Sequence, residues 1–157
     1  MSEIVATAVE ATSSLFELKK HELCLDVPWA NFDVDADPRR FSQVIVNLLI
    51  NAARYTAPGG VVSVKAFRDG RELVVQVEDS GIGLAADEVG QVWDGLLRAP
   101  RAGAPAEGRL GLGLTFVKSV TELHGGRVSA RSPGLGRGST FEVRLPRAAT
   151  EVARPHA

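Results

Sequence analysis

Residues 37–60 read DPRRFSQVIVNLLINAARYTAPGG, and this stretch predicts one amphipathic helix with defined ends. Asp37 is suited to cap the N-terminus, and Pro38 fits the first helical position, where a missing backbone N–H is no loss. The Pro-Gly-Gly sequence at 58–60 ends the helix. The apolar side chains between these ends are spaced to form one buried face: Phe41, Val44, Ile45, Leu48, Leu49 and Ala52.

The segments on either side of this helix carry the signals of a helix, a strand and a hairpin. Residues 3–20 have apolar positions close to a helical period, and residues 22–27 alternate as a β-strand does. Residues 61–67 and 72–78 are two further β-rich runs. The Asp-Gly sequence at 69–70 predicts a hairpin turn between them.

The C-terminal half predicts one more helix and one more pair of strands. Residues 99–108 lack periodicity and predict a mobile loop. Residues 112–124 predict a helix that the Gly-Gly sequence at 125–126 ends. Residues 127–131 and 140–145 read as the last two strands, joined by a glycine-rich turn.

With one further helix before residues 112–124, the order of the elements is α-β-α-β-β-α-α-β-β, which indicates an α/β (α+β) two-layer sandwich. We expect about three helices on one face of a mixed, mainly antiparallel sheet of about five strands. The sequence therefore predicts one domain over residues 1–146, followed by a disordered tail over residues 147–157.

The composition is that of an ordinary globular domain without bulk attraction to nucleic acid or lipid. Hydrophobic residues make up 45% of the 157 residues and charged residues 24%, and the net charge is −1. No apolar run approaches the roughly 20 residues of a membrane span, and no signal peptide is recognisable at Met1. The single cysteine, Cys24, excludes an internal disulfide and a multi-cysteine metal site. These features predict a cytoplasmic domain with no nucleic-acid partner and no direct membrane contact.

Two asparagines and an arginine interrupt the apolar helix. Asn47, Asn51 and Arg54 are spaced four and three residues apart, so they project from the same side of the helix. Asn is a poor helix former, and two of them in an apolar helix are costly unless both are hydrogen-bonded or ligated. A carboxamide oxygen is a hard ligand that suits Mg²⁺. The alternative at this point is that the pair caps or bridges neighbouring backbone.

Three glycine-containing stretches follow, and each has a functional and a plain interpretation. Asp79, at a strand end before Gly-Ile-Gly, would accept a hydrogen bond from an amine such as that of adenine, or it belongs to an ordinary turn. The glycines of residues 108–114 open a helix whose N-terminus would bind phosphate, or they form a hinge. The turn at residues 134–141 adds the hydroxyl of Thr140 to a polar site, or it is only a hairpin turn.

Together, the order and spacing of these four stretches resemble the N box and the three glycine boxes of histidine-kinase ATPase domains. The linking sequences Leu-His-Gly-Gly-Arg at 123–127 and Phe-Glu-Val-Arg-Leu-Pro at 141–146 also match, and the resemblance covers residues 3–146. It implies the left-handed α/β (Bergerat, or GHKL) ATP-binding fold, shared with gyrase-type, mismatch-repair and heat-shock chaperone ATPases. It also implies that the domain binds Mg-ATP and, in a full-length sensor kinase, donates the γ-phosphate to a histidine of a separate dimerisation domain.

The resemblance assigns roles to the matching positions on the helix and the strand end. Asn51 would coordinate Mg²⁺, and Asn47 would lie close to the phosphates. Arg54 stands where the family has a phosphate-contacting Lys or Arg, and these three are the implied catalytic residues. Tyr55 would pack against adenine, and Asp79 would accept from its N6 amine.

The glycine boxes supply the rest of the implied ATP site. Gly81 and Gly83 would shape the adenine pocket, and Thr140 would close its purine end through water. Gly111 and Gly113 would hold the phosphate side beneath a mobile lid. The further positions that the resemblance places around ATP are Ile82, Leu84, Arg98, Leu112 and Leu114.

Two features depart from the family pattern. The F box before the lid keeps one aromatic residue, Trp93, and has Leu96 in place of a Phe, which bears on lid closure and catalytic rate more than on ATP binding. Arg109-Leu110 stands where many members have Gly-Thr or Gly-Ser. Leu before the Gly-Leu-Gly-Leu run resembles a branch common among hybrid kinases, so a phosphorelay parent is one expectation.

None of the three histidines has the sequence surroundings of a phosphoacceptor. His21 precedes a strand, His124 ends a helix, where a cation is favourable, and His156 lies in the tail. We therefore expect a monomer that binds ATP without autophosphorylating. Its partners would be the dimerisation and histidine-phosphotransfer domain and, indirectly, a response-regulator receiver.

Two other functions remain open at the level of the sequence. The weak F box is also compatible with a degenerate pseudokinase that serves as an interaction module. An anti-sigma-type serine kinase has the same fold, although the Leu-His-Gly-Gly-Arg and Gly-x-Gly-Ser-Thr sequences argue against it.

Overall fold

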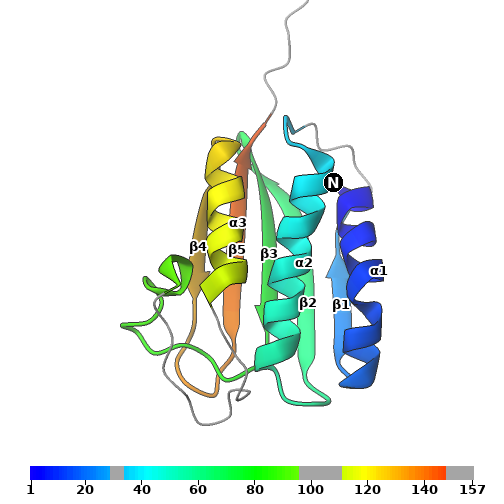
Figure 1. The fold of residues 1–157 in the computed structure, drawn as a ribbon, viewed down its shortest axis with the longest axis vertical. Coiled ribbons are helices and arrows are strands. Elements are labelled where there is room, and N and C mark those ends of the chain that lie inside the picture. Colours follow the sequence, from blue (N-terminus) through cyan, green and yellow to red (C-terminus); the bar gives the residue numbers. More distant parts are fainter. Residues whose placement is uncertain (29–33, 96–110, 148–157) are drawn as a thin grey trace, which may run out of the picture.

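The computed structural model describes residues 1–28, 34–95 and 111–147, and these contain a five-stranded sheet (Figure 1). β1 pairs with β2 in parallel, and the pairs β2–β3, β3–β5 and β4–β5 are antiparallel. The predicted mixed, mainly antiparallel sheet is confirmed. In spatial order the strands are β1 (Glu22–Asp26), β2 (Val61–Asp69), β3 (Glu72–Asp79), β5 (Ser139–Pro146) and β4 (Arg127–Arg131).

The helices α1 (Ser2–Leu18), α2 (Pro38–Tyr55) and α3 (Gly111–Leu123) lie on one face of the sheet, as predicted (Figure 1). The further helix expected before α3 is, within the described residues, a short turn of 3-10 helix, η1 (Val92–Asp94). It ends at Gly95, whose left-handed backbone (φ 68°) cannot continue a helix. No helix of the described chain is both long and apolar enough to cross a membrane.

The predicted buried face of α2 forms the centre of the hydrophobic core. Its six side chains, Phe41, Val44, Ile45, Leu48, Leu49 and Ala52, are all 0% exposed. They pack against the apolar side chains that β2, β3 and β5 direct to the same side of the sheet, among them Val64, Val77 and Val143. Asp37 caps the N-terminus as expected, and its carboxylate accepts from the backbone N–H groups of Arg40 and Arg39, which lowers the pKa of Asp37.

His124 ties the end of α3 to the start of α2. Its Nε2 accepts a hydrogen bond from the backbone N–H of Asp37 (3.2 Å), and its Nδ1 lies 2.7 Å from the carbonyl oxygen of Val120. The ring thus joins the first residue before α2 to the last turn of α3 through both of its nitrogens. The ring also meets Phe41 edge to face, with centroids 6.3 Å apart.

The turn between α1 and β1 holds the other end of α2. The Lys19 ammonium donates to the carbonyl of Ala53 (2.8 Å). His21 Nε2 lies 3.2 Å and 3.1 Å from the carbonyl oxygens of Thr56 and Ala57. Donors at the carbonyl end of a helix satisfy its unpaired acceptors and oppose its dipole. These contacts fix the end of α2 that carries the predicted site residues.

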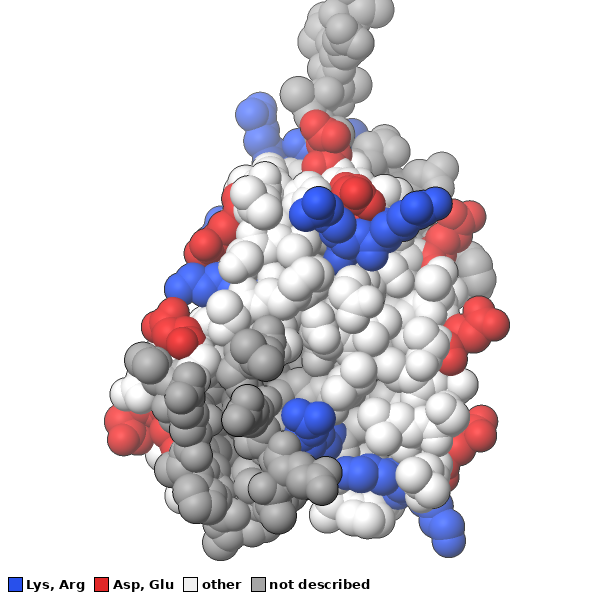
Figure 2. Space-filling model, viewed as in Figure 1, with Lys and Arg blue, Asp and Glu red and all other residues white. Residues whose placement is uncertain are grey.

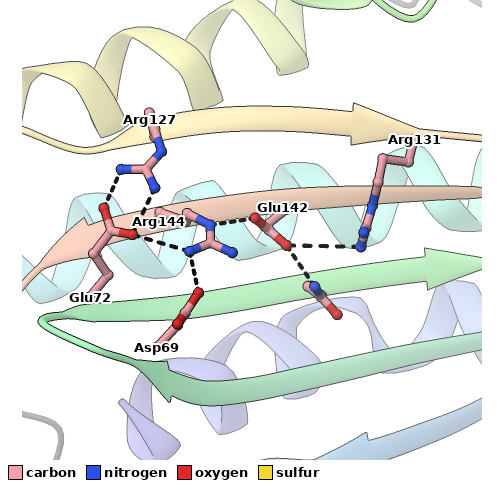
Figure 3. Close-up of polar contacts among 7 residues, drawn as sticks. Asp69, Glu72, Arg127, Arg131, Glu142 and Arg144 are labelled. Atoms are coloured by element: carbon pink, nitrogen blue, oxygen red, sulfur yellow. Dashed lines mark hydrogen bonds and ion pairs between the residues drawn. The ribbon is translucent and has the colours of Figure 1, made fainter.

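A network of charged side chains covers the opposite face of the sheet (Figure 3). Arg144 lies at its centre, 2.7 Å from Asp69, 3.1 Å from Glu72 and 2.5 Å from Glu142. These carboxylates raise the pKa of Arg144. Because this face is hydrogen-bonded and charged, it needs no second layer of helices. The network consists of Asp69, Glu72, Gln76, Arg127, Arg131, Glu142 and Arg144.

Candidate functional site

A hollow opens beside the C-terminal end of α2, where β3 ends and β5 begins. Asn51 and Tyr55 line it from the last turns of α2, and Asp79 lines it as the last residue of β3. Segments that are far apart in the sequence thus converge on one site. The predicted site residues that meet here are Asn51, Tyr55, Asp79, Ile82, Gly83 and Leu84, and the other lining residues are Ser139 and Phe141.

Asp79 is a carboxylate held almost out of contact with solvent, at 6% exposure. Burial raises the pKa of Asp79 to about 6, although the backbone N–H groups of Gly81 and Ser139 donate to the carboxylate and oppose the shift. The bond from Gly81 to Oδ1 is 2.8 Å long. A buried carboxylate facing a hollow is costly unless a ligand supplies a further donor. Asp79 is therefore suited to accept a hydrogen bond from a ligand in this hollow.

Gly81 and Gly83 bring the walls of the hollow together. A Cβ on Gly81 would lie 2.3 Å from the backbone oxygen of Tyr55, a distance that real Cβ atoms essentially never show. A Cβ on Gly83, whose φ is 69°, would lie 2.1 Å from the backbone oxygen of Gly134. Only glycine therefore lets the loop after β3 lie between the end of α2 and the turn before β5.

Asn47 lies one helical turn before Asn51 and faces the start of α3. A Cβ added to Gly113 would make an ordinary contact with its Oδ1, at 3.6 Å. The N-terminus of α3 therefore approaches the asparagine side of α2. The first N–H groups of a helix lack internal partners and favour negative charge. This side of the site is suited to an anionic group.

Other predicted residues lie outside the lining of the hollow. Arg54 is exposed on the last turn of α2. Leu114 is 1% exposed and belongs to the hydrophobic core. Gly111 and Leu112 are the first two residues of α3. Arg98 falls outside the described residues, as do the loop predicted over 99–108 and the F-box residue Leu96.

The sheet register does not bring Thr140 to the hollow. Thr140 pairs with Glu78, whereas Ser139 pairs with Asp79. Successive side chains of a strand point to opposite faces, so Thr140 lies on the charged face with Glu78 and Ser139 lies with Asp79 on the helix-covered face. Ser139 is 7% exposed and lines the hollow. Of the two neighbouring hydroxyl residues, it is therefore Ser139 that lines the hollow.

Phe141 is a second lining residue that the sequence analysis missed. It follows Ser139 by two positions, so the strand period could have placed both on the same face. Its ring meets Trp93 edge to face, with centroids 5.7 Å apart. Trp93 belongs to η1, which an ion pair between Asp94 and Lys118 (2.9 Å) joins to α3. The retained aromatic residue of the F box therefore packs behind the wall of the hollow.

Basic side chains gather at the same end of the helix-covered face. Figure 2 shows Lys and Arg side chains where α1 and α2 end. Lys19 and Lys20 directly follow α1, and Arg54 lies on the last turn of α2 beyond Asn51. A cluster of one sign of charge attracts a ligand of the opposite sign. Of these side chains, Arg54 shares its side of α2 with Asn51, so it favours an anionic ligand at that side of the site.

Residues 36–149 match the family described as histidine kinase-, DNA gyrase B- and HSP90-like ATPases. The chain belongs to this family. The matched range includes every residue that lines the hollow, and it confirms the resemblance drawn from the four sequence stretches.

This ATPase-family chain is similar to histidine kinases in sequence and in structure. It is 34% identical over 148 residues to the circadian input-output histidine kinase CikA of Synechococcus elongatus, a match that covers 93% of the chain and 20% of CikA. The solved mycobacterial sensor histidine kinase MprB has 27% identity and a TM-score of 0.79, covering 94% of this chain and 95% of that one. Full-length ShkA in complex with AMPPNP has 26% identity and a TM-score of 0.75, covering 94% and 30%. The chain spans about a fifth of the length of CikA.

The ATPase-family site offers amide rather than carboxylate ligands to a cation. Within the described residues, no group of three or more His, Cys, Asp or Glu side chains could hold a metal ion. Asn51 does present a carboxamide to the hollow. Mg²⁺ binds through one or two protein oxygens and completes its shell with water and phosphate oxygens. The donors present therefore fit Mg²⁺ that arrives with a phosphate ligand.

Proposed function

We propose that this domain binds Mg-ATP and donates the γ-phosphate to a histidine of a separate dimerisation domain, as the catalytic domain of a two-component sensor kinase. The buried Asp79 carboxylate carries this assignment, because it needs a donor inside a hollow whose other wall holds Asn51. Membership of the ATPase family supports nucleotide binding. The similarity to CikA, named as a histidine kinase, and to ShkA, solved with AMPPNP, supports the kinase assignment.

The part of the hollow beside Asp79 would hold the adenine base. Ionised Asp79 would accept from the exocyclic amine, and the Ser139 hydroxyl would contact the same edge of the base directly or through water. Flat apolar walls would hold the ring, with Tyr55 on the side of α2 and Phe141 on the side of β5. A base that presents an acceptor to Asp79 would be rejected, because two acceptors would then meet in a buried site.

The phosphates would extend toward α2 and the start of α3. Asn51 would hold Mg²⁺ through its carboxamide oxygen, with Asn47 beside the phosphates and Arg54 contacting them from the last turn of α2. A bound Mg²⁺ would neutralise charge on the phosphate oxygens. The protein would contribute chiefly by positioning the γ-phosphorus for in-line attack.

The nucleophile would come from another domain. His21 and His124 are both engaged at the ends of α2, and neither lines the hollow. An acceptor histidine nitrogen would attack the γ-phosphorus, and ADP would leave. A response-regulator receiver would then take the phosphoryl group from that histidine.

Titration with a fluorescent ATP analogue, with and without Mg²⁺, tests nucleotide binding. We expect saturable binding by the unmodified chain and a loss of at least about tenfold in Asp79→Asn, which presents an amide donor to the base. Glu78→Gln is the matched control, because Glu78 is the exposed carboxylate one position earlier on β3. Absence of binding by the unmodified chain at millimolar nucleotide would refute the proposal and favour the interaction module.

Labelled ATP tests the phosphoryl transfer. We expect acid-labile label on an added dimerisation domain that contains a histidine, and none on the 157-residue chain alone. Stable acid-labile label on the chain alone would show that one of its own histidines is the acceptor. Nucleotide binding without transfer to any dimerisation domain would favour a pseudokinase.

A further inference from the structure

Ser132 makes an unusually complete set of hydrogen bonds for a side chain that does not line the hollow. It directly follows β4 and is half-buried. Its hydroxyl oxygen accepts from the backbone N–H groups of Leu84 (3.0 Å) and Gly134 (3.2 Å). The hydroxyl donates to the carbonyl of Gly138 at 2.6 Å. A serine hydroxyl offers one donor and two acceptor positions, so all three are used.

The hydrogen-bond partners of Ser132 belong to the two segments that line the hollow where the adenine base is proposed to bind. Leu84 belongs to the loop after β3, and Gly138 immediately precedes β5 and its lining residue Ser139. Ser132 stands between the end of β4 and the turn that leads to β5. Its side chain thus connects that turn to the loop after β3.

The same two segments also bond to each other through their backbones. The N–H of Gly136 donates to the carbonyl of Ile82 (2.7 Å), and the N–H of Gly138 donates to the carbonyl of Gly81 (3.0 Å). A Cβ on Gly138 would lie 2.0 Å from the backbone oxygen of Asp79, so the turn before β5 lies directly against the backbone of Asp79. A small change in the separation of the two segments would therefore move Asp79 relative to the opposite wall.

We propose that Ser132 is a positioning residue for the base-binding end of the site. Its hydroxyl sets the separation of the loop after β3 from the turn before β5, and through it the fit of the base against Asp79. This role rests on the proposed binding of an adenine nucleotide. Loss of the hydroxyl weakens the contribution of the base to affinity and leaves the contributions of the phosphates and Mg²⁺ unchanged, because the described hydrogen bonds of Ser132 go to Leu84, Gly134 and Gly138.

Binding of adenosine, ADP and Mg-ATP to matched Ser132 variants tests this role at a temperature well below unfolding. Ser132→Ala and Ser132→Val lack the hydroxyl. Ser132→Thr keeps the hydroxyl on a side chain that has the same shape as Val. Ser129→Ala is the control, since Ser129 is an exposed serine on the same strand. We expect Ala and Val to weaken all three ligands by the same factor, about five- to tenfold, corresponding to one or two lost hydrogen bonds. We expect Thr and the control to stay within about twofold of the unmodified chain.

The outcomes separate this role from a purely structural one and from failure of the proposed function. An Ala variant with a lower melting temperature but unchanged affinity for adenosine would overturn the positioning role. A Thr variant as weak as the Val variant would also overturn it, because the hydroxyl would then not be the cause. If the unmodified chain bound none of the three ligands, the proposed function itself would fail, whereas binding that is insensitive to Ser132→Ala would refute only the positioning role.

Discussion

Asp79 and Ser139 are paired across β3 and β5, and both line the hollow. The backbone N–H of Ser139 donates to the Asp79 carboxylate, while burial raises the pKa of that carboxyl to about 6. The carboxylate is therefore stabilised by its neighbours only in part. A ligand amine would supply the missing stabilisation. We therefore expect ligand binding to depend on the pH and on the hydroxyl of Ser139.

We predict that adenosine binding weakens as the pH falls below about 6. Protonated Asp79 cannot accept a hydrogen bond from the amine without first reorienting its proton, so affinity would fall about tenfold for each pH unit well below the pKa. Adenosine is the ligand of choice because it carries no phosphate that titrates in this range. Binding isotherms between pH 5 and 8 measure the effect. Glu78→Gln should keep the pH dependence with its midpoint moved slightly to lower pH, because the charge on Glu78 helps to raise the pKa of Asp79. A flat profile would contradict the role of Asp79 as the acceptor.

We predict that Asp79→Asn stabilises the free domain at neutral pH while it impairs binding. The folded pKa of Asp79 lies above the ordinary value of 3.8, so the folded protein binds more protons than the unfolded chain between about pH 4 and 6. Stability from this group is present at low pH and is lost as the pH rises through 6. The cost above pH 6 is on the order of 2–3 kcal/mol, which Asn avoids.

Urea unfolding at pH 4 and pH 7.5 measures this effect. The gain in the free energy of unfolding should appear at pH 7.5 and largely vanish at pH 4. Glu78→Gln, on the exposed side of the same strand, should change little at either pH. An equal effect of Asp79→Asn at both pH values would mean that packing rather than charge is responsible.

We predict that neighbouring hydroxyls on β5 have unequal effects on nucleotide binding. Ser139→Ala removes a hydroxyl inside the hollow and should weaken an ATP analogue by about three- to tenfold. Thr140→Ala removes one on the charged face and should leave affinity within about twofold. Fluorescence titration of the two variants decides the matter. The reverse ranking would mean that the strand register at the start of β5 differs from the one described.

We predict that Asn51→Ala removes most of the Mg²⁺ dependence of ATP binding. The measured quantity is the ratio of the dissociation constants in EDTA and in Mg²⁺, which should fall toward one because the variant lacks the proposed protein ligand of Mg²⁺. Gln43→Ala is the control, since Gln43 is an exposed amide on the same helix, two turns before Asn51. An unchanged ratio in Asn51→Ala would exclude this residue as the ligand.

We predict that His124→Ala lowers the free energy of unfolding by about 2 kcal/mol. The variant loses the hydrogen bonds to Asp37 and Val120 and the edge-to-face contact with Phe41. Chemical unfolding followed by circular dichroism measures the change. Glu122→Ala alters an exposed side chain near the same helix end and should have little effect. A loss below about 0.5 kcal/mol would show that water replaces these contacts at no cost.

Local sequence was sufficient for most elements of the fold. Asp37 and Pro38 start α2 because a cap and a restricted φ act within one helical turn. The hairpin between β2 and β3 turns at Gly70, whose φ is 59°, as the Asp-Gly sequence predicts. α1 ends at Leu18, two residues before the predicted boundary, and Lys20 adopts a left-handed backbone (φ 53°). Periodicity predicts the existence of a helix more reliably than it predicts the residues at which the helix begins and ends.

Most of the candidate site was also predictable, because the order of four short stretches carries the family signature. Asn51, Tyr55 and Asp79 were assigned from their motifs, and the structure brings them to one hollow. The motif alone does not distinguish Ser139 from Thr140 as the residue at the hollow, because the two are adjacent and chemically alike. A shift of one residue in a strand moves a side chain to the opposite face of the sheet, and only the pairing with β3 decides between the two.

The sequence by itself determined the helices, the hairpin and the family, because caps, turns and hydrophobic periods act between residues a few positions apart. Only the tertiary structure decided that β5 lies between β3 and β4, that Ser139 rather than Thr140 faces Asp79, and that Ser132 joins the two loops beside the hollow. Each of these depends on backbone hydrogen bonds between distant segments. Such bonds leave no periodic trace in the sequence, because every residue type presents nearly the same backbone donor and acceptor.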